Sequence, residues 1–291
     1  MEVPGHAGAI GPFRWRYVAR CVPPVLRPHV EAIIAYDEHA PGHCVVRHEV
    51  PRLGTVILLQ PQPAICVGPE PILQPRGFVV GGMARARVTT RFEERQRGVE
   101  IVLSPLGARS VLGVEGREIA GRVLPLEDFA RSVRGLADVL DRASGCVDAL
   151  PGLEQWLVRR VTASSCDLRV AASVVQALMR SGGTMPIHEL VRLSGYSHGY
   201  LGRLCKRQLG ATPKALGRVI RFMRVVESVR PALWDGGQGT IAAAPDNWAR
   251  LALEMGYADH SHLVRDIRAF AGAPPSELPR LLTPELSPLG G

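Results

Sequence analysis

Apolar positions recur with a helical period in the second half of the chain, where two short amphipathic segments follow each other. Within Pro186–Pro213, apolar residues fall at i, i+3, i+4 in the first segment and at i, i+4, i+8 in the second. The turn Ser194-Gly195-Tyr196 separates the two segments. Two short helices joined by a glycine-containing turn are typical of a helix-turn-helix. The apolar positions are Ile187, Leu190 and Val191, then Leu201, Cys205 and Leu209.

The same pattern returns nearer the C-terminus, which makes it an internal repeat. Trp248–Glu254 and His260–Phe270 are predicted as helices, separated by Met255-Gly256-Tyr257. Both units contain Gly-Tyr, then Leu-x-Arg-x-x-Lys/Arg, then Gly-x-x-Pro, with one extra residue in the second turn. So many matched positions argue against coincidence. They are Gly195, Tyr196, Leu201, Arg203, Lys206, Gly210 and Pro213, and then Gly256, Tyr257, Leu263, Arg265, Arg268, Gly272 and Pro275.

A longer amphipathic helix is predicted between the two units. Pro213 suits its first turn, and a stripe of apolar residues follows. Three basic residues lie on its opposite face, namely Lys214, Arg218 and Arg221. We therefore expect a rigid linker helix, followed by a flexible loop over residues 231–247 whose role the pattern leaves open.

The first half of the chain predicts a different architecture. Short apolar or alternating runs, separated by Pro, Gly and charged residues, predict a small antiparallel sheet or barrel. These runs are Thr55–Gln60, Ala64–Gly68, Gly77–Gly82, Arg85–Arg91 and Gly98–Ser104. Helices are expected over Leu26–Ile34 and Leu106–Leu112, from Pro125 through Leu140, and over Leu153–Val161.

The predicted fold class is therefore α+β, with a small β-rich mixed domain followed by an all-α domain. We divide the chain into an irregular segment (residues 1–24), a sensor or regulatory domain (25–162), a helical domain (167–282) and a tail (283–291). The boundary falls in the short polar bridge Thr162–Asp167.

Positive charge is concentrated around the first helix pair. Thr184–Arg230 holds nine basic residues and two acidic ones, whereas four basic residues face seven acidic ones from Pro231 onward. Such clustering is expected of a surface that faces nucleic-acid phosphates. A solvated helix face is the alternative for a charge run considered alone.

The six scattered cysteines favour free, mostly buried thiols. No C-x-x-C pair occurs among Cys21, Cys44, Cys66, Cys146, Cys166 and Cys205. Because neither a long apolar run nor a signal peptide is evident, we expect a soluble cytoplasmic protein that does not enter a membrane. One alternative is a metal-binding or enzymatic N-terminal domain, since HAPGHCVVRH carries His39, His43, Cys44 and His48. No metal or cofactor is assigned otherwise.

The two units and their linker resemble the DNA-binding domain of the AraC/XylS family of transcriptional regulators. The resemblance covers roughly Asp167–Leu282 and rests on GYSHGYLGRLCKRQLGATP, RVIRFMRV and GYADHSHLVRDIRAFAGAPP. The segments YDEHAPG, RFEERQRGVEI and LSPLGARSVLGV are similar to a sensor-like domain found on some family members. The loop before Trp248 is longer than is usual in the family.

The resemblance implies binding to double-stranded DNA, with one helix of each unit in successive major-groove segments, and no enzymatic activity. Arg203 and Arg265 are the expected base contacts, because a bidentate Arg–guanine pair discriminates by roughly 1–3 kcal/mol. Gly199 and Gly202 depart from the family's base-reading side chains, so the first unit is expected to favour backbone contacts. A small-molecule effector in the N-terminal domain and a homodimer are further expected partners. The implied DNA contacts are His198, Gly199, Gly202, Arg203, Lys206, Arg207, Lys214, Arg218, Arg221, Ser261, His262, Arg265 and Arg268.

Overall fold

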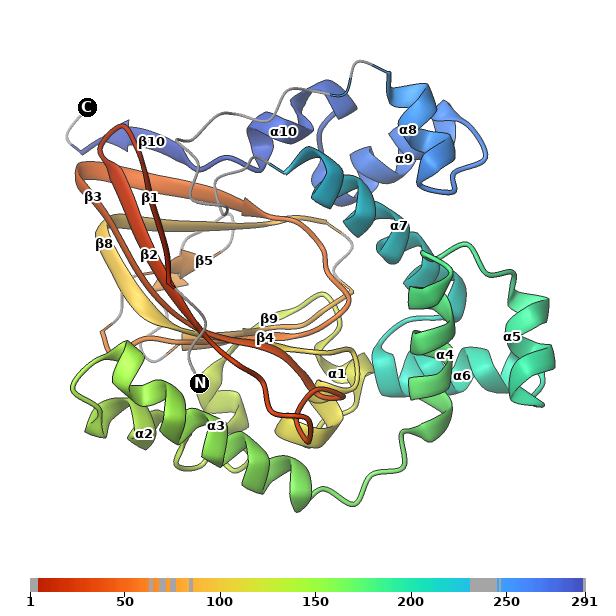
Figure 1. Ribbon diagram of the computed structural model, residues 1–291, viewed down its shortest axis with the longest axis horizontal. Helices are drawn as coiled ribbons and strands as arrows, with labels where there is room; N and C mark the ends of the chain where they lie inside the picture. Colours follow the sequence, from red (N-terminus) through yellow and green to blue (C-terminus); the bar gives the residue numbers. More distant parts are fainter. Residues whose placement is uncertain are drawn as a thin grey trace.

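The computed structural model describes residues 5–62, 65–67, 72–73, 77–83, 86–230, 245 and 247–289. An antiparallel β-sheet built mainly by the N-terminal half is followed by a helical C-terminal part (Figure 1). This arrangement confirms the predicted α+β fold class.

Two long antiparallel strands, β3 (Val30–Glu49) and β8 (Val88–Leu103), pair with each other at the centre of the sheet. Among the described residues the strand order is β1-β2-β3-β8-β4-β7-β9, with β10 on β3, the short β5 on β8 and the short β6 on β5. The remaining strands are β1 (His6–Ile10), β2 (Phe13–Arg20), β4 (Val56–Leu59), β5 (Cys66–Val67), β6 (Ile72–Leu73), β7 (Gly77–Val80), β9 (Val123–Pro125) and β10 (Glu285–Pro288).

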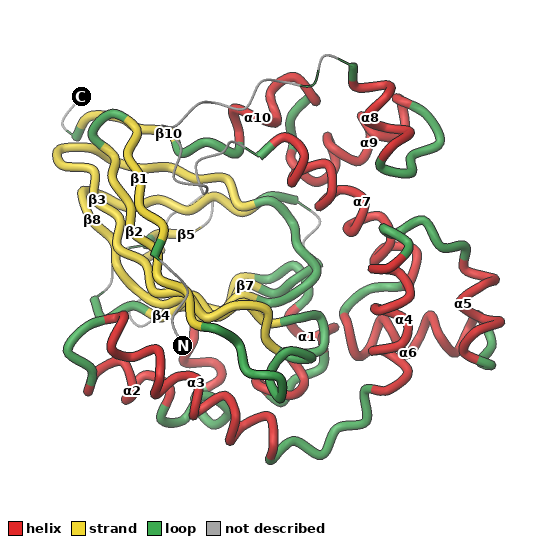
Figure 2. The backbone as a smooth tube through the Cα atoms, viewed as in Figure 1, coloured by secondary structure: helices red, strands yellow, loops and turns green. Residues whose placement is uncertain are grey.

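The sheet is curved, and its two faces have different surroundings (Figure 2). Along β3, Ile33 and Ala35 point to one face while Ile34 and Tyr36 point to the other, as the two-residue period of a strand requires. Ile33 and Ala35 pack against α2 (Leu136–Arg142) and α3 (Cys146–Thr162) in a core that also holds Trp156. The opposite face carries the aromatic and charged side chains described below.

A second core holds the C-terminal helices together around the buried Phe222. These helices are α4 (Arg169–Arg180), α5 (Ile187–Ser194), α6 (His198–Leu209), α7 (Pro213–Val229), α8 (Trp248–Glu254), α9 (His260–Ala271), the short η4 (Pro275–Glu277) and α10 (Leu278–Leu281). Both repeated helix pairs and the linker helix are therefore present where the sequence predicts them. Among the described helices, none combines the length and apolar character needed to cross a membrane.

Both ends of the chain are more regular than predicted. Residues 6–20 were expected to be irregular but form β1 and β2, which pair with each other and with β3. Residues 285–288 were assigned to a tail but form β10 on β3. The expected helix over Leu26–Ile34 is wrong as well, because β3 begins at Val30 and pairs with β2 and β8 along its two edges.

Three further elements have other boundaries in the structure than the sequence predicts. Arg85–Arg91 and Gly98–Ser104 belong largely to one strand, β8, rather than to two. The continuous helix expected from Pro125 is interrupted: a short 3₁₀ helix, η2, covers Leu126–Phe129, and α2 begins only after Gly135, whose φ is 78°. Helix α3 begins at Cys146, before the expected Leu153. The segment Leu106–Leu112 does contain a helical turn, η1 (Ala108–Leu112), closed by Gly113 with a φ of 75°.

Candidate nucleic-acid interface and internal cavity

The first helix pair has the local geometry that its sequence predicts. Gly195 ends α5 with a φ of 71°, a left-handed conformation that suits glycine. The Ser197 side chain then caps α6 by accepting a hydrogen bond from the Tyr200 amide at 3.3 Å. Leu201 and Cys205 of α6 are fully buried, so the opposite side of this helix faces solvent.

The solvent side of α6 carries the predicted contact residues of the first unit. His198, Arg203 and Lys206 are exposed, as is Gly199, while Gly202 is half-buried. A side-chain carbon at Gly202 would meet no described atom within 4 Å, so no packing contact requires glycine there. Two exposed tyrosines, Tyr196 and Tyr200, stack beside this surface with ring centres 4.7 Å apart.

The second pair repeats the design with a different cap. Asp259 caps α9 by accepting a hydrogen bond from the His262 amide at 2.7 Å. The turn from Gly256 to Asp259 is one residue longer than that from Gly195 to Ser197, as the repeat alignment predicts. Ser261, Arg265 and Arg268 are exposed and His262 is half-buried.

The three basic residues of α7 that were predicted to contact DNA differ in their surroundings. Lys214 is exposed, but the Arg218 guanidinium donates to Asp266 of α9 at 2.6 and 3.1 Å and lies over the Phe270 ring. Arg221 donates to the Gly183 carbonyl at 2.5 Å and lies over the Tyr257 ring. The contacts of Arg218 and Arg221 therefore hold α7 against neighbouring parts of the chain, while the Arg218 side chain stays 40% exposed.

The N-terminal half contacts both units. Glu115, just before α1 (Gly116–Ile119), lies 3.4 Å from Arg207 of α6. Arg87 of the segment before β8 donates to the Ala271 carbonyl of α9 at 3.2 Å. Beside the first contact is an open hollow of about 460 Å³ lined by basic groups and by Tyr200 and Leu204. Its cationic side chains are Arg117, Arg203, Lys206 and Arg207.

A cavity of about 480 Å³ lies on the face of the sheet opposite α2 and α3. Aromatic side chains from β2, β3 and β7 line it, and Met223 and Val226 of α7 close part of it together with residues 281–284. One wall therefore belongs to the sheet and another to the linker helix of the candidate nucleic-acid interface. Its aromatic lining comprises Phe13, Trp15, Tyr17, Tyr36 and Phe78.

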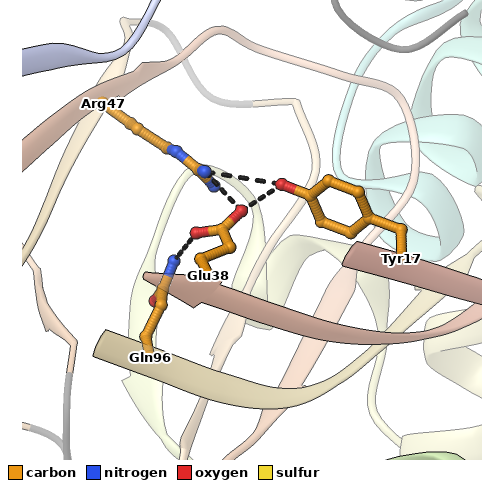
Figure 3. A network of polar contacts seen from close by, with 4 residues as sticks. All are labelled: Tyr17, Glu38, Arg47 and Gln96. Carbon is orange, nitrogen blue, oxygen red and sulfur yellow. Dashed lines mark hydrogen bonds and ion pairs between the residues drawn. The ribbon is translucent and has the colours of Figure 1, made fainter. Parts of the chain in front are cut away.

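A network of charged and polar groups is buried at this cavity (Figure 3). Glu38 has no exposed surface and accepts hydrogen bonds from Tyr17, Arg47 and Gln96. The Arg47 guanidinium also lies 5.5 Å from the centre of the Phe13 ring. Although burial opposes its charge, the neighbouring Glu38 raises the pKa of Arg47, so the guanidinium stays charged.

The candidate metal ligands are not brought together. Cys44 is buried in β3, whereas His43 is exposed in part, pairs with Pro288 of β10 and has its Nδ1 2.7 Å from the Pro41 carbonyl. His48 faces Thr89 and Glu285. Among the described residues, no group of three His, Cys, Asp or Glu side chains could hold a metal ion.

The Glu38 network was not singled out from the sequence. Tyr36 and Glu38 belong to YDEHAPG, and Gln96 belongs to RFEERQRGVEI, two of the three segments quoted above for the N-terminal resemblance. Their alternation along β3 and β8 could have placed them on one face, but only the pairing of Glu38 with Gln96 across the two strands shows that they meet.

Neither a protein-family model nor a curated protein matches the sequence. Several solved structures are similar to it. ToxT from Vibrio cholerae is 11% identical over 94% of this chain and 100% of that chain, with a TM-score of 0.45. The unsaturated fatty acid bound ToxT of strain SCE256 is 11% identical over 91% and 98%, with a TM-score of 0.45. The AraC-like transcriptional activator CuxR is 14% identical over 74% and 81%, with a TM-score of 0.28.

Proposed function

We propose that this protein is a sequence-specific DNA-binding transcriptional regulator of the AraC type. Its two helix-turn-helix units would read two successive major-groove segments, and a small molecule in the internal cavity would modulate binding. The observation that carries the proposal is the repeated, capped helix pair, α5–α6 and α8–α9, joined by the single helix α7.

The exposed side chains support a division of labour between the units. Helix α6 presents Arg203, Lys206 and Arg207 beside Arg117, and such clustered cations suit the phosphate backbone. Helix α9 presents Ser261, His262, Arg265 and Arg268, which offer varied donors and acceptors to base edges. Lys214 joins the proposed contacts, whereas the internal partners of Arg218 and Arg221 argue against including those two.

The cavity supports modulation by an effector. Because Met223 and Val226 of α7 line it along with the sheet, a bound molecule would touch the helix that joins the two units. Such a molecule could change DNA affinity only if it bound the DNA-competent arrangement more or less tightly than the alternative. A cavity of about 480 Å³ is within the range used for small-molecule ligands.

Binding of the full chain to duplex DNA tests the proposal. Selection from genomic fragments, followed by titration at about 50 and 200 mM salt, should give a sequence preference and a steep fall in affinity with salt. Lys206→Ala should weaken binding, while Arg131→Ala, an exposed change in the N-terminal half, should not. A chain that binds no duplex at about 50 mM salt would refute the proposed function.

Double-stranded DNA is thus the proposed partner, with a homodimer as a further proposal. The matching location is the cytoplasm, in association with the nucleoid.

A further inference from the structure

The polar end of the cavity contains three buried atoms without a hydrogen-bond partner in the described part of the chain. They are the Tyr36 hydroxyl, Nε of Arg47 and Oε1 of Gln96. All three residues line the cavity, and Tyr36 and Gln96 are 6% and 5% exposed. Because buried polar groups are almost always hydrogen-bonded, each such atom calls for an explanation.

Glu38 holds two of these three side chains in place. Its two carboxylate oxygens accept from Arg47 and from Gln96, which leaves the remaining Nε–H donor and Oε1 acceptor available. Tyr36 lies two residues before Glu38 on β3 and therefore on the same face of the sheet. Burial, followed by the charge of Glu38, raises the pKa of Tyr36 well above its usual value, so its hydroxyl is a neutral donor and acceptor.

The free atoms define what a ligand must offer. Nε of Arg47 is a donor and needs an acceptor, while Oε1 of Gln96 is an acceptor and needs a donor. An ammonium group has no acceptor for Arg47, and a carboxylate has no donor for Gln96. A hydroxyl or a primary carboxamide supplies both without adding a charge.

The charges around the cavity also favour a ligand without a net charge. The charge of Arg47 is already balanced by Glu38, and Arg52 lies 3.4 Å from Glu100. Of the charged residues that line the cavity in the described part of the chain, the others are Glu31, Glu49, Glu227 and Arg230. An anionic ligand would therefore enter a site with an excess of carboxylates and no unbalanced cation at its buried end.

We infer that the cavity binds an uncharged, mainly apolar molecule whose one polar group, a hydroxyl or carboxamide, bonds to Arg47, Gln96 and Tyr36. The aromatic walls formed by Phe13, Trp15 and Phe78 would hold its apolar body. The inference rests on the proposed function only in regarding the cavity as an effector site.

Three probes with one skeleton test this class of ligand on the full chain. 4-Phenylbutanamide, 4-phenylbutanoate and 4-phenylbutylamine differ only in the polar group, and thermal shift and calorimetric titration without DNA report their binding. The amide should stabilise the protein and bind at least about tenfold more tightly than either charged analogue, because each analogue leaves a buried group unpaired.

A variant distinguishes ligand binding from a structural role. Tyr36→Phe removes a hydroxyl that has no partner in the described structure, so the ligand-free protein should melt at the same temperature or higher. Its affinity for the amide should fall about threefold to tenfold. Tyr200→Phe, which changes an exposed tyrosine of α6, is the matched control and should leave amide binding unchanged.

Three results would overturn the inference. They are equal or tighter binding of a charged probe, no effect of Tyr36→Phe on amide affinity, and no amide binding at about 5 mM, where a fragment of this size should be detectable. If the chain binds duplex DNA but not the amide, the ligand class alone is refuted. If it binds the amide but no duplex, the proposed function alone is refuted.

Discussion

The carboxylate of Glu115 lies 3.4 Å from Nε of Arg207 and so joins the N-terminal half to the second helix of the first unit. Glu115 also caps α1 through the Glu118 backbone. The neighbouring Gly116 is packed so closely that a side-chain carbon there would lie 2.5 Å from the Leu209 carbonyl carbon. This close backbone contact holds the ion pair in place. The negative charge of Glu115 would repel a phosphate group that approached Arg207.

We predict that Glu115→Gln increases affinity for duplex DNA. The amide retains an acceptor for the α1 cap but removes the negative charge beside Arg207 and Arg117, which lie 3.4 and 2.9 Å from the carboxylate. Since the Arg207 side chain is 54% exposed, the pair is a weak one, and the gain should be about twofold to fivefold. Titration of a random duplex at low salt measures it.

Glu127→Gln provides the control, because it removes the same charge from an exposed site on η2. An equal gain in both variants would mean that net charge, and not the contact with Arg207, sets the affinity. Unchanged or weaker binding by Glu115→Gln would contradict the prediction.

Arg265→Ala and Lys206→Ala should affect DNA binding in different ways. We expect loss of Arg265 to reduce the preference for the selected site by about 1–3 kcal/mol, because its guanidinium group can donate two hydrogen bonds to the edge of a guanine base. We expect loss of Lys206 to weaken selected and random duplexes alike and to reduce the salt slope by about one. Competition titrations at two salt concentrations separate these effects. If both variants lost specific and random binding equally, the proposed division between the units would be wrong.

The sequence predicts the helical half well because its signals are local. The turns predicted at Gly195 and Gly256 separate the helices of the two units in the structure, where Ser197 and Asp259 cap the second helix of each unit. The second unit was expected to begin at Trp248, and it does. The loop at 231–247 lies outside the described residues except for positions 245 and 247.

The sheet was harder to predict because its contacts are distant in sequence. Val30–Glu49 reads as mixed local patterns, yet β3 pairs with β2, β8 and the C-terminal β10. Likewise, the charge of Arg218 suggested a DNA contact, since nothing local reveals that Asp266 will be buried beside it. The polar network at the cavity was not predicted for the same reason, since Glu38 and Gln96 meet only through strand pairing.

Cys205 should be chemically inert in the folded protein. Burial raises the pKa of its thiol to about 11, so at pH 8 only about one molecule in a thousand carries the reactive thiolate. Cys21 is exposed and should be alkylated first. Iodoacetamide labelling at pH 8, mapped by peptide mass spectrometry, should modify Cys21 in the native state and both residues in urea. Rapid native labelling of Cys205 would instead support a redox-sensitive role.

The ion pair between Arg218 and Asp266 should contribute to stability in an asymmetric way. Asp266 is 2% exposed, whereas the Arg218 side chain is 40% exposed and can be hydrated if its partner is lost. Arg218→Ala strands a buried carboxylate and should cost about 3–5 kcal/mol of unfolding free energy. Asp266→Asn keeps an oxygen acceptor for Arg218 and should cost less, about 1–2 kcal/mol. Urea denaturation measures both.

Lys214→Ala, an exposed change on the same helix, separates stability from DNA contact. It should change the unfolding free energy by no more than about 0.5 kcal/mol while weakening duplex binding. Arg218→Lys should lose much of the stability of the pair, because an ammonium group cannot reproduce the two guanidinium hydrogen bonds to Asp266. If Arg218→Ala instead left stability intact and abolished DNA binding, Arg218 would be a DNA contact, as its position on the helix first suggested.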